Sequence, residues 1–267
     1  MLNNAFEGYN ACLFAYGQTG SGKSYSIAGY GENKGIVPRA CDEIFRRINE
    51  AKANNTQNVQ YSVEISMIEI YMEKVHDLFM KPDKRPKDGL KIRDDPKKGV
   101  YVQGATFVPV DSYAAIEHQI NVGNENRTVG ATNMNATSSR AHTVNQIVFK
   151  QRFFNPDGSP ERELVSNINL IDLAGSERSK STGATGARLD EGNKINASLS
   201  ALGNVIRALA KKATNPGDKA VIPYRDSALT FILKPFLGGN ARTAMIAALS
   251  PADINYDETK STLVYAW

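Results

Sequence analysis

The stretch Gly17-Gln18-Thr19-Gly20-Ser21-Gly22-Lys23-Ser24 fits the pattern GxxxxGK[ST] at every fixed position. It follows a short apolar run at 11–16, which we predict to be a buried strand, and it precedes a predicted helix. Glycines let successive backbone N–H groups converge on one anion, and a helix N-terminus adds positive potential. A glycine-rich turn with a solvated lysine is the alternative, but the strand-to-helix setting favours a phosphate-binding loop.

Two side chains at the end of this phosphate loop (residues 17–24) are suited to a nucleotide. Lys23 is expected to reach the β- and γ-phosphates. Ser24 is expected to give its hydroxyl to Mg²⁺, which prefers hard oxygen ligands. The remaining loop residues are expected to bind phosphate oxygens through their backbone: Gly17, Gln18, Thr19, Gly20, Ser21 and Gly22.

A second apolar strand, predicted at 164–173, ends in a carboxylate followed by a glycine. Asp172 is placed to hold Mg²⁺ through water, and Gly175 can offer its backbone N–H to a γ-phosphate because no side chain obstructs the approach. A carboxylate at a strand end is also typical of a turn or helix cap. The phosphate loop elsewhere in the chain favours the functional interpretation.

The run at 133–142 combines hydroxyl and amide side chains with one arginine and precedes a strand predicted at 143–154. Such groups can coordinate Mg²⁺ and position water. A polar capping loop is the alternative, because Ser, Thr and Asn also serve there for structural reasons.

Strands and helices alternate along the chain, which predicts an α/β fold of three layers, with helices on both faces of a mostly parallel sheet. The strand at 59–71 alternates apolar and polar residues and is expected to be half-buried. Residues 81–99 hold three prolines and many lysines, which predicts exposed loop with at most a short strand. Another strand is predicted at 243–249, and helices at 38–49, 111–122, 189–212, 224–237 and from 257 onward.

The length of 267 residues and the ordinary shares of hydrophobic (41%) and charged (22%) residues predict one domain, 1–267. No apolar run approaches the roughly 20 residues of a membrane-spanning helix, and no secretion signal is evident, so the cytosol is expected. Cys12 and Cys41 lie in apolar patterns typical of buried, reduced thiols. The net charge of +4 suits an acidic partner or simply solubility.

Three phrases, GQTGSGKS, NATSSRAH and DLAGSE in this order, closely resemble the P-loop, switch I and switch II of kinesin motor domains. YRDSALT at 224–230 and the phrase at 237–266 are similar to the family's C-terminal motor region, and SPADINYDET looks most like the kinesin-3 (Unc-104-like) branch. The resemblance implies a P-loop NTPase fold, ATP and Mg²⁺ as cofactors, and microtubule-stimulated ATP hydrolysis coupled to motility.

Carried over by position, the resemblance also implies roles for single residues. Ser139 would complete the Mg²⁺ shell, and Ser138 would help to position the attacking water. Arg140 would pair with Glu177, so that two loops near the γ-phosphate close together. Tyr25 stands where the family often stacks a ring on adenine, with ordinary helix packing as the alternative.

The helix predicted at 189–212 matches the kinesin helix that lies against tubulin and moves when switch II senses phosphate. Each basic residue near it is also typical of a solvated surface. The candidate tubulin contacts are Lys97, Lys98, Lys211, Lys212, Lys219 and Arg225. The chain departs from common family residues at Asp190, Ala197 and Val264, where positive charge is lost, and at Ala141, so a weaker filament interface is expected.

Kinesin motor domains usually carry strands and a base-contacting segment ahead of the P-loop, and a neck linker at the end. We therefore expect this chain alone to lack part of the sheet and pocket, and to be unable to walk. A nucleotide- or tubulin-binding module without productive turnover is the alternative function. A non-motor GTPase or kinase is disfavoured, since the sequence has no NKxD-type guanine segment and no recognisable acceptor site.

The expected partner is tubulin, in the cytoplasm and on the microtubule cytoskeleton. We expect no nucleic-acid contact and no membrane contact from this segment, and a possible dimer through regions outside the chain.

Overall fold

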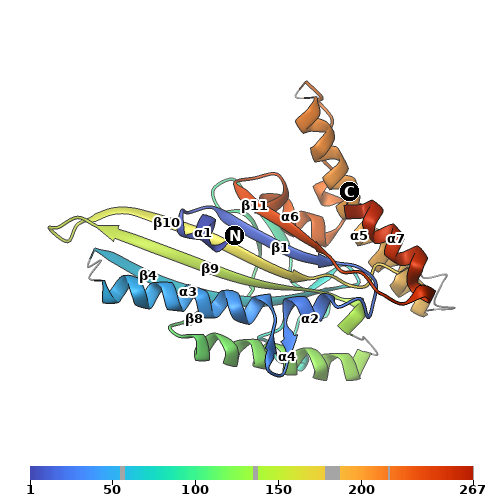
Figure 1. Ribbon diagram of the computed structural model, residues 1–267, viewed down its shortest axis with the longest axis horizontal. Helices are drawn as coiled ribbons and strands as arrows, with labels where there is room; N and C mark the ends of the chain where they lie inside the picture. Colours follow the sequence, from blue (N-terminus) through green and yellow to red (C-terminus); the bar gives the residue numbers. More distant parts are fainter. Residues whose placement is uncertain (55–57, 135–137, 178–186, 216, 267) are drawn as a thin grey trace.

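The computed structural model describes residues 1–54, 58–134, 138–177, 187–215 and 217–266, of which 129–134, 138 and 187–189 are described by backbone alone. Its centre is a sheet in the strand order β11-β1-β10-β9-β4-β5, with β8 paired to β4 (Figure 1). The strands are β1 (Asn10–Tyr16), β4 (Val59–Tyr71), β5 (Lys74–Asp77), β8 (Val108–Val110), β9 (His142–Phe154), β10 (Pro160–Asp172) and β11 (Ala241–Ala247).

The sheet is mixed. β11, β1 and β10 are neighbours and run parallel, whereas β9 is antiparallel to both β10 and β4. The reason is the connection: residues 155–159 join β9 to β10, and a parallel pair would need a crossover of about a dozen residues or more. The predicted helix-covered α/β sheet is confirmed, and its adjacent parallel strands lie in the half that carries the phosphate loop.

Helices cover both faces of the sheet (Figure 1). α2 (Lys23–Ile27), α3 (Ile36–Ala53) and α4 (Tyr113–Met134) lie on one face, where α1 (Leu2–Phe6) also packs into the core. α5 (Ala187–Thr214) and α6 (Ala228–Leu237) cover the other face, and α7 (Tyr256–Ala266) lies beside β11. Shorter elements are β2 (Gly29–Tyr30), β3 (Asn33–Lys34), η1 (Pro82–Lys84), β6 (Ile92–Asp95), β7 (Gly99–Val102), η2 (Ser138–Arg140), η3 (Tyr224–Asp226) and η4 (Asp253–Asn255).

The two faces of the sheet hold separate hydrophobic cores because successive side chains of a strand point to opposite faces. In β1, Leu13 and Ala15 join the core under α3, while Cys12 and Phe14 join the core under α5 and α6. α3 buries its apolar stripe, including Ile44 and Ile48, against the first core. Both cysteine thiols are free and buried, as predicted, and burial raises the pKa of Cys41 to about 12.

Several predicted boundaries differ in the structure. α4 continues to Met134 because Gly123 does not end the helix; its missing side chain instead lets the backbone pack closely on Met67. The helix predicted at 224–237 is η3 followed by α6, with Ser227 in an extended conformation between them. β4 is not half-buried throughout, since Ser66 and Ile68 are covered by the second core.

The sequence did not predict the short strands that depend on pairing partners: β2, β3, β5, β7 and β8. The short strand allowed within 81–99 is β6. In the part of the chain that the structure describes, no helix has the length and apolar character needed to cross a membrane.

Candidate nucleotide site

The phosphate loop leaves the end of β1 and turns into α2. Gly17, Gly20 and Gly22 have φ angles of +153°, +81° and +101°, in the region that disfavours other residues. A side chain on Gly17 would also collide with the carbonyl oxygen of Ala248. Ser21 donates to the Gln18 carbonyl oxygen through its N–H (3.3 Å) and its hydroxyl (2.8 Å), which closes the turn.

Lys23 is buried inside this turn, with only 6% of its surface exposed. Its Nζ donates to the Gln18 carbonyl oxygen at 2.8 Å. Burial lowers the pKa of Lys23, and the negative charges of Asp172 and Glu177 oppose that shift. A buried ammonium has lost most of its hydration, so a nearby negative charge stabilises it. A phosphate bound in this turn would supply that charge to Lys23.

Ser24 and Asp172 meet across α2 and the end of β10. The Ser24 hydroxyl donates to Asp172 Oδ2 at 2.5 Å, and the second carboxylate oxygen, Oδ1, is buried without a protein partner. Burial raises the pKa of Asp172, while the Ser24 hydrogen bond and Lys23 act in the opposite direction. A hydroxyl beside a carboxylate with an unpartnered oxygen fits the hard oxygen ligands that Mg²⁺ prefers, directly or through water. Within the described ranges no group of three or more His, Cys, Asp or Glu side chains could hold a metal ion on its own.

The carboxylate segment (residues 172–177) joins the phosphate loop to the hydroxyl segment (residues 138–142). Two of its backbone N–H groups donate to the hydroxyl segment, and two donate to β1 and the phosphate loop that follows it. The bonds are Leu173 N to Ala15 O (3.3 Å), Ala174 N to His142 Nδ1 (3.0 Å), Gly175 N to Ser139 O (2.9 Å) and Ser176 N to Gly17 O (3.1 Å). The three motifs of the sequence therefore meet at one place.

Glu177 turns onto the phosphate loop. Its carboxylate accepts from the Thr19 backbone N–H at 2.8 Å and from the Thr19 hydroxyl at 2.7 Å. An anion thus already occupies a backbone N–H that the sequence predicted to bind phosphate. A side chain on Gly175 would collide with the same carboxylate and with the Thr19 hydroxyl, so glycine is required for this approach.

The predicted Arg140–Glu177 pair is not formed among the described residues, because Glu177 is held by Thr19. Arg140 instead donates from Nη1 to Glu191 Oε2 at 2.9 Å, and Glu191 is a buried residue of α5. Burial, with the nearby Glu191 carboxylate adding to it, raises the pKa of Tyr71 to about 12. Sequence reasoning missed Glu191, although its position on the same helix face as Ile195, four residues later, marks it as inward-facing.

His142 is the last residue of the polar run at 133–142, and the sequence predicted no role for it. It is buried at the start of β9, where Nδ1 accepts from Ala174 N and Nε2 lies 2.8 Å from the Ser198 hydroxyl of α5. Burial, with a smaller effect of Lys23, lowers the pKa of His142 to about 3, so the ring is neutral. The histidine thus connects the carboxylate segment to α5.

The comparison with protein families decides what kind of site this is. The family described as kinesin motor domain matches residues 1–267. The chain belongs to the kinesin motor domain family. Kinesin-related protein 1 of Dictyostelium discoideum is 53% identical over 267 residues, which cover all of this chain and 12% of that protein. Kinesin-like protein KIF1C of Homo sapiens is 53% identical over 268 residues, covering all of this chain and 24% of that protein.

The kinesin-3 resemblance is also confirmed. Kinesin-like protein unc-104 of Caenorhabditis elegans is 53% identical over 273 residues, covering all of this chain and 17% of that protein. A solved KIF14 dimer with AMP-PNP, in complex with a microtubule, matches with a TM-score of 0.88 and 46% identity, over 99% of this chain and 72% of that chain. KIF14 with ADP, also in complex with a microtubule, gives 0.86 and 47%, over 99% and 73%.

The remaining predicted site residues of this kinesin motor domain lie around the loop. Tyr25 is 51% exposed, and its ring centroid lies 6.1 Å from that of the exposed Tyr30. This exposure argues against helix packing as its role. Ser139 is partly buried, and the side chain of Ser138 lies outside the described residues.

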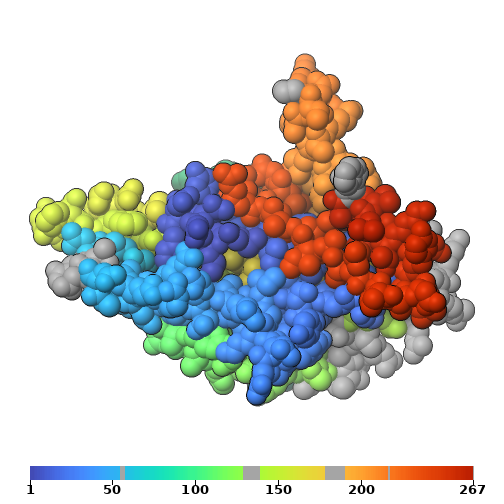
Figure 2. All heavy atoms as spheres, in the orientation of Figure 1, coloured from blue at the N-terminus to red at the C-terminus, as the bar shows by residue number. Residues whose placement is uncertain are grey.

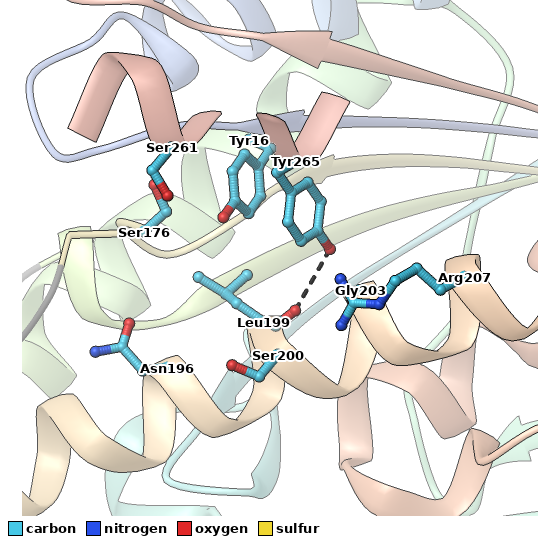
Figure 3. A pocket seen from close by; sticks show the side chains of 9 residues that line it. All are labelled: Tyr16, Ser176, Asn196, Leu199, Ser200, Gly203, Arg207, Ser261 and Tyr265. Atoms are coloured by element: carbon cyan, nitrogen blue, oxygen red, sulfur yellow. Dashed lines mark hydrogen bonds between the residues drawn. The ribbon is translucent and has the colours of Figure 1, made fainter. Parts of the chain in front are cut away.

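A cavity of about 310 Å³ lies beside the carboxylate segment of the motor domain (Figure 3). Tyr16 and Tyr265 stack in its wall with ring centroids 3.9 Å apart, and the Tyr265 hydroxyl donates to the Leu199 carbonyl oxygen at 3.4 Å. The lining residues come from β1, the carboxylate segment, α5 and α7: Tyr16, Ser176, Asn196, Leu199, Ser200, Gly203, Arg207, Ser261 and Tyr265. The turn of α5 at 196–203 therefore borders open space.

The candidate tubulin contacts of the motor domain gather near α5 and α6. Lys97 and Lys98 form the β6–β7 turn, where both backbone N–H groups donate to Asp95. Lys211 and Lys212 lie in the last turn of α5, whose end projects from the body (Figures 1 and 2). Arg225 lies 3.7 Å from Asp94, so part of its charge supports the fold.

Proposed function

We propose that residues 1–267 form one kinesin motor core that hydrolyses Mg·ATP, that microtubules stimulate this reaction, and that the reaction drives motility. The chain spans 12% to 24% of the length of the curated relatives named above, so the activity of any longer protein is part of the proposal. One observation carries it: the carboxylate segment is hydrogen-bonded to the phosphate loop and to the hydroxyl segment at once.

In this proposal, Lys23 binds the terminal phosphates, and Ser24, Ser139 and Asp172 supply oxygens toward Mg²⁺, which neutralises phosphate charge when bound. The backbone of the phosphate loop binds the other phosphate oxygens, and Tyr25 stacks on the base. Ser138 helps to position the attacking water.

Competition for Thr19 explains how nucleotide is sensed. A terminal phosphate and the Glu177 carboxylate cannot both accept from the Thr19 N–H, so Glu177 leaves the loop when nucleotide enters. Gly175 N–H, now bonded to Ser139 O, becomes the donor to the γ-phosphate. Arg140 can then exchange Glu191 for Glu177, which changes how α5 is held.

The α5 and α6 face is proposed to bind tubulin, because α5 is tied to the sensing loops and its end carries Lys211 and Lys212. Tubulin's acidic surface would attract these side chains. The protein is proposed to act on microtubules in the cytoplasm. The dimer contact through segments outside this chain, and the lack of nucleic-acid and membrane contacts, stay predictions.

The test is phosphate release from Mg·ATP, measured with and without microtubules, for the chain and for Lys23→Ala and Glu177→Ala. We expect stimulation in the unchanged chain. Lys23→Ala should weaken nucleotide binding by about tenfold or more, because a charged hydrogen bond contributes about 1.5–3 kcal/mol. Glu177→Ala should bind nucleotide but lose stimulated turnover by about a hundredfold.

Lys84→Ala, which removes an exposed lysine of η1 beside α4, is the control and should behave as the unchanged chain does. Nucleotide binding without stimulation would favour the alternative, a binding module without productive turnover. Failure to bind nucleotide at all would refute the proposal.

A further inference from the structure

The coupling between the nucleotide site and α5 has a second route that does not pass through Arg140. His142 lies between Ala174 of the carboxylate segment and Ser198 of α5, and hydrogen bonds on both ring nitrogens link the two (3.0 Å and 2.8 Å). Ala174 adjoins Gly175, whose N–H the proposed function redirects to phosphate. A shift of the segment there must move the Ala174 N–H as well.

The proton positions on this route follow from the partners. The Ala174 N–H can only donate, so His142 Nδ1 must carry the lone pair. The Ser198 hydroxyl has one proton, which it gives to the Ile195 carbonyl oxygen at 2.7 Å, so it accepts from His142 Nε2–H. One neutral tautomer satisfies every bond, and the buried ring has no other arrangement that does.

The turn of α5 that carries Ser198 borders open space. Asn196, Leu199 and Ser200 line the cavity of about 310 Å³ between α5 and α7 (Figure 3), so one side of this turn is only partly covered. The other side rests on His142. A close-packed helix would resist a shift, whereas a helix that borders a cavity can take a second position at lower cost.

We propose that His142 is a positioning residue that transmits the state of the carboxylate segment to α5 through Ser198, and so couples microtubule binding to ATP turnover. This rests on the proposed function for the meaning of the coupling. The relay itself is a property of the fold, and hydrogen exchange measures it separately. It runs from Ala174 through His142 and Ser198 to Ile195.

The variants separate the two halves of the relay. Ser198→Ala removes the hydroxyl with little change in volume. His142→Asn places an acceptor near the position of Nδ1 and loses the donor to Ser198. Ser166→Ala is the matched control, because its buried hydroxyl also donates to a carbonyl oxygen, that of Ala5 at 2.7 Å, in the middle of β10 and away from the relay.

The first measurement is the ratio of microtubule-stimulated to basal phosphate release. In Ser198→Ala we expect basal turnover within about twofold of the unchanged chain and stimulation lowered by about fivefold or more, as for a coupling of 1–3 kcal/mol. The His142→Asn and Ser198→Ala double variant should be no worse than the worse single variant, because both cut one route. Unchanged stimulation, or multiplying effects in the double variant, would overturn the relay.

The second measurement does not need microtubules. Hydrogen exchange of the α5 amides at 195–203 is recorded with and without Mg²⁺ and a non-hydrolysable ATP analogue. We expect the nucleotide to change exchange in the unchanged chain and in Ser166→Ala, and to change it much less in Ser198→Ala. Equal responses in all three would overturn the relay. Absence of microtubule stimulation in the unchanged chain would refute the proposed function alone, and the exchange result would still decide the relay.

Discussion

At the residue scale, Asp172 shows how burial sets the chemistry of the nucleotide site. Asp172 is only 8% exposed, and its Oδ1 is buried with no partner among the described residues. Burial raises its pKa, so the protein holds a group that would be more stable if neutral. The ionised form of Asp172 therefore lowers the free energy of unfolding, and a bound cation would offset that loss. The same reasoning applies in reverse to Lys23, whose pKa burial lowers.

Asp172→Asn is predicted to stabilise the nucleotide-free protein at neutral pH while removing Mg²⁺-dependent nucleotide binding. The folded state binds the carboxyl proton more tightly than the unfolded state does, so stability falls as pH rises through the interval between the two pKa values. The gain from Asn should be full above the raised pKa and vanish below about 3.9, the ordinary value. Melting curves from pH 3 to 8 would check this, with about 2–4 °C for each kcal/mol.

The control is Asp253→Asn in η4, an exposed aspartate, which should show no pH-dependent gain. If the stability gained by Asp172→Asn grew as the pH fell, the conclusion that the pKa of Asp172 is raised would be contradicted.

At the scale of elements, α6 begins with a complete capping arrangement. The Ser227 hydroxyl accepts from Thr230 N at 3.1 Å, and the Thr230 hydroxyl accepts from Ser227 N at 3.2 Å. Glu73 adds a carboxylate that accepts from Ala228 N at 2.6 Å, at the positive end of the helix. These bonds explain why the helical conformation is interrupted at Ser227, between η3 and α6.

Ser227→Ala is predicted to lower the free energy of unfolding by about 0.5–2 kcal/mol, because a backbone N–H at the helix start loses its acceptor. Urea unfolding would measure the loss. Ser227→Gly, which leaves the N-cap position accessible to water, should cost only a few tenths of a kcal/mol. Equal losses in both variants would show that side-chain packing, not capping, is responsible.

Local patterns predicted some elements and not others. The 3–4 spacing in α3 and α5 and the phosphate loop are local signals, and each was found where the sequence placed it. β5 and β8 are short, and they form because each pairs with β4. The local sequence of a short strand does not show which strand it will pair with. In this structure Arg140 pairs with Glu191 while Thr19 holds Glu177, and only the fold shows this arrangement. The Arg140–Glu177 pair expected beside a γ-phosphate stays a prediction.

At the scale of the whole molecule, the sheet separates two working faces. The face under α3 and α4 supports the nucleotide loop, and the face under α5 and α6 carries the basic residues proposed to meet tubulin. The net charge of +4 is modest, so the distribution of charge over the two faces matters more than its sum.

Lys211→Ala with Lys212→Ala is predicted to weaken microtubule binding about two- to tenfold at low salt and to reduce its salt dependence, because exposed charges at an interface act mainly through screened attraction. Co-sedimentation with microtubules at several salt concentrations would measure both. Lys81→Ala with Lys84→Ala, which removes two exposed lysines near α4, is the matched control. If the control pair weakens microtubule binding to a similar extent, the proposal that the α5 and α6 face binds the filament is contradicted.

The hairpin of β9 and β10 has a practical consequence. Its two strands end together at the nucleotide site, where Thr143 pairs with Asp172, and its turn at 155–159 lies at the other end of 13-residue strands, on the order of 40 Å away. A fluorescent dye or a surface tether attached at that turn would be joined to both sensing loops by a two-stranded arm and would still lie far from them. Single-molecule recordings made with it would leave the catalytic end and the α5 face unobstructed.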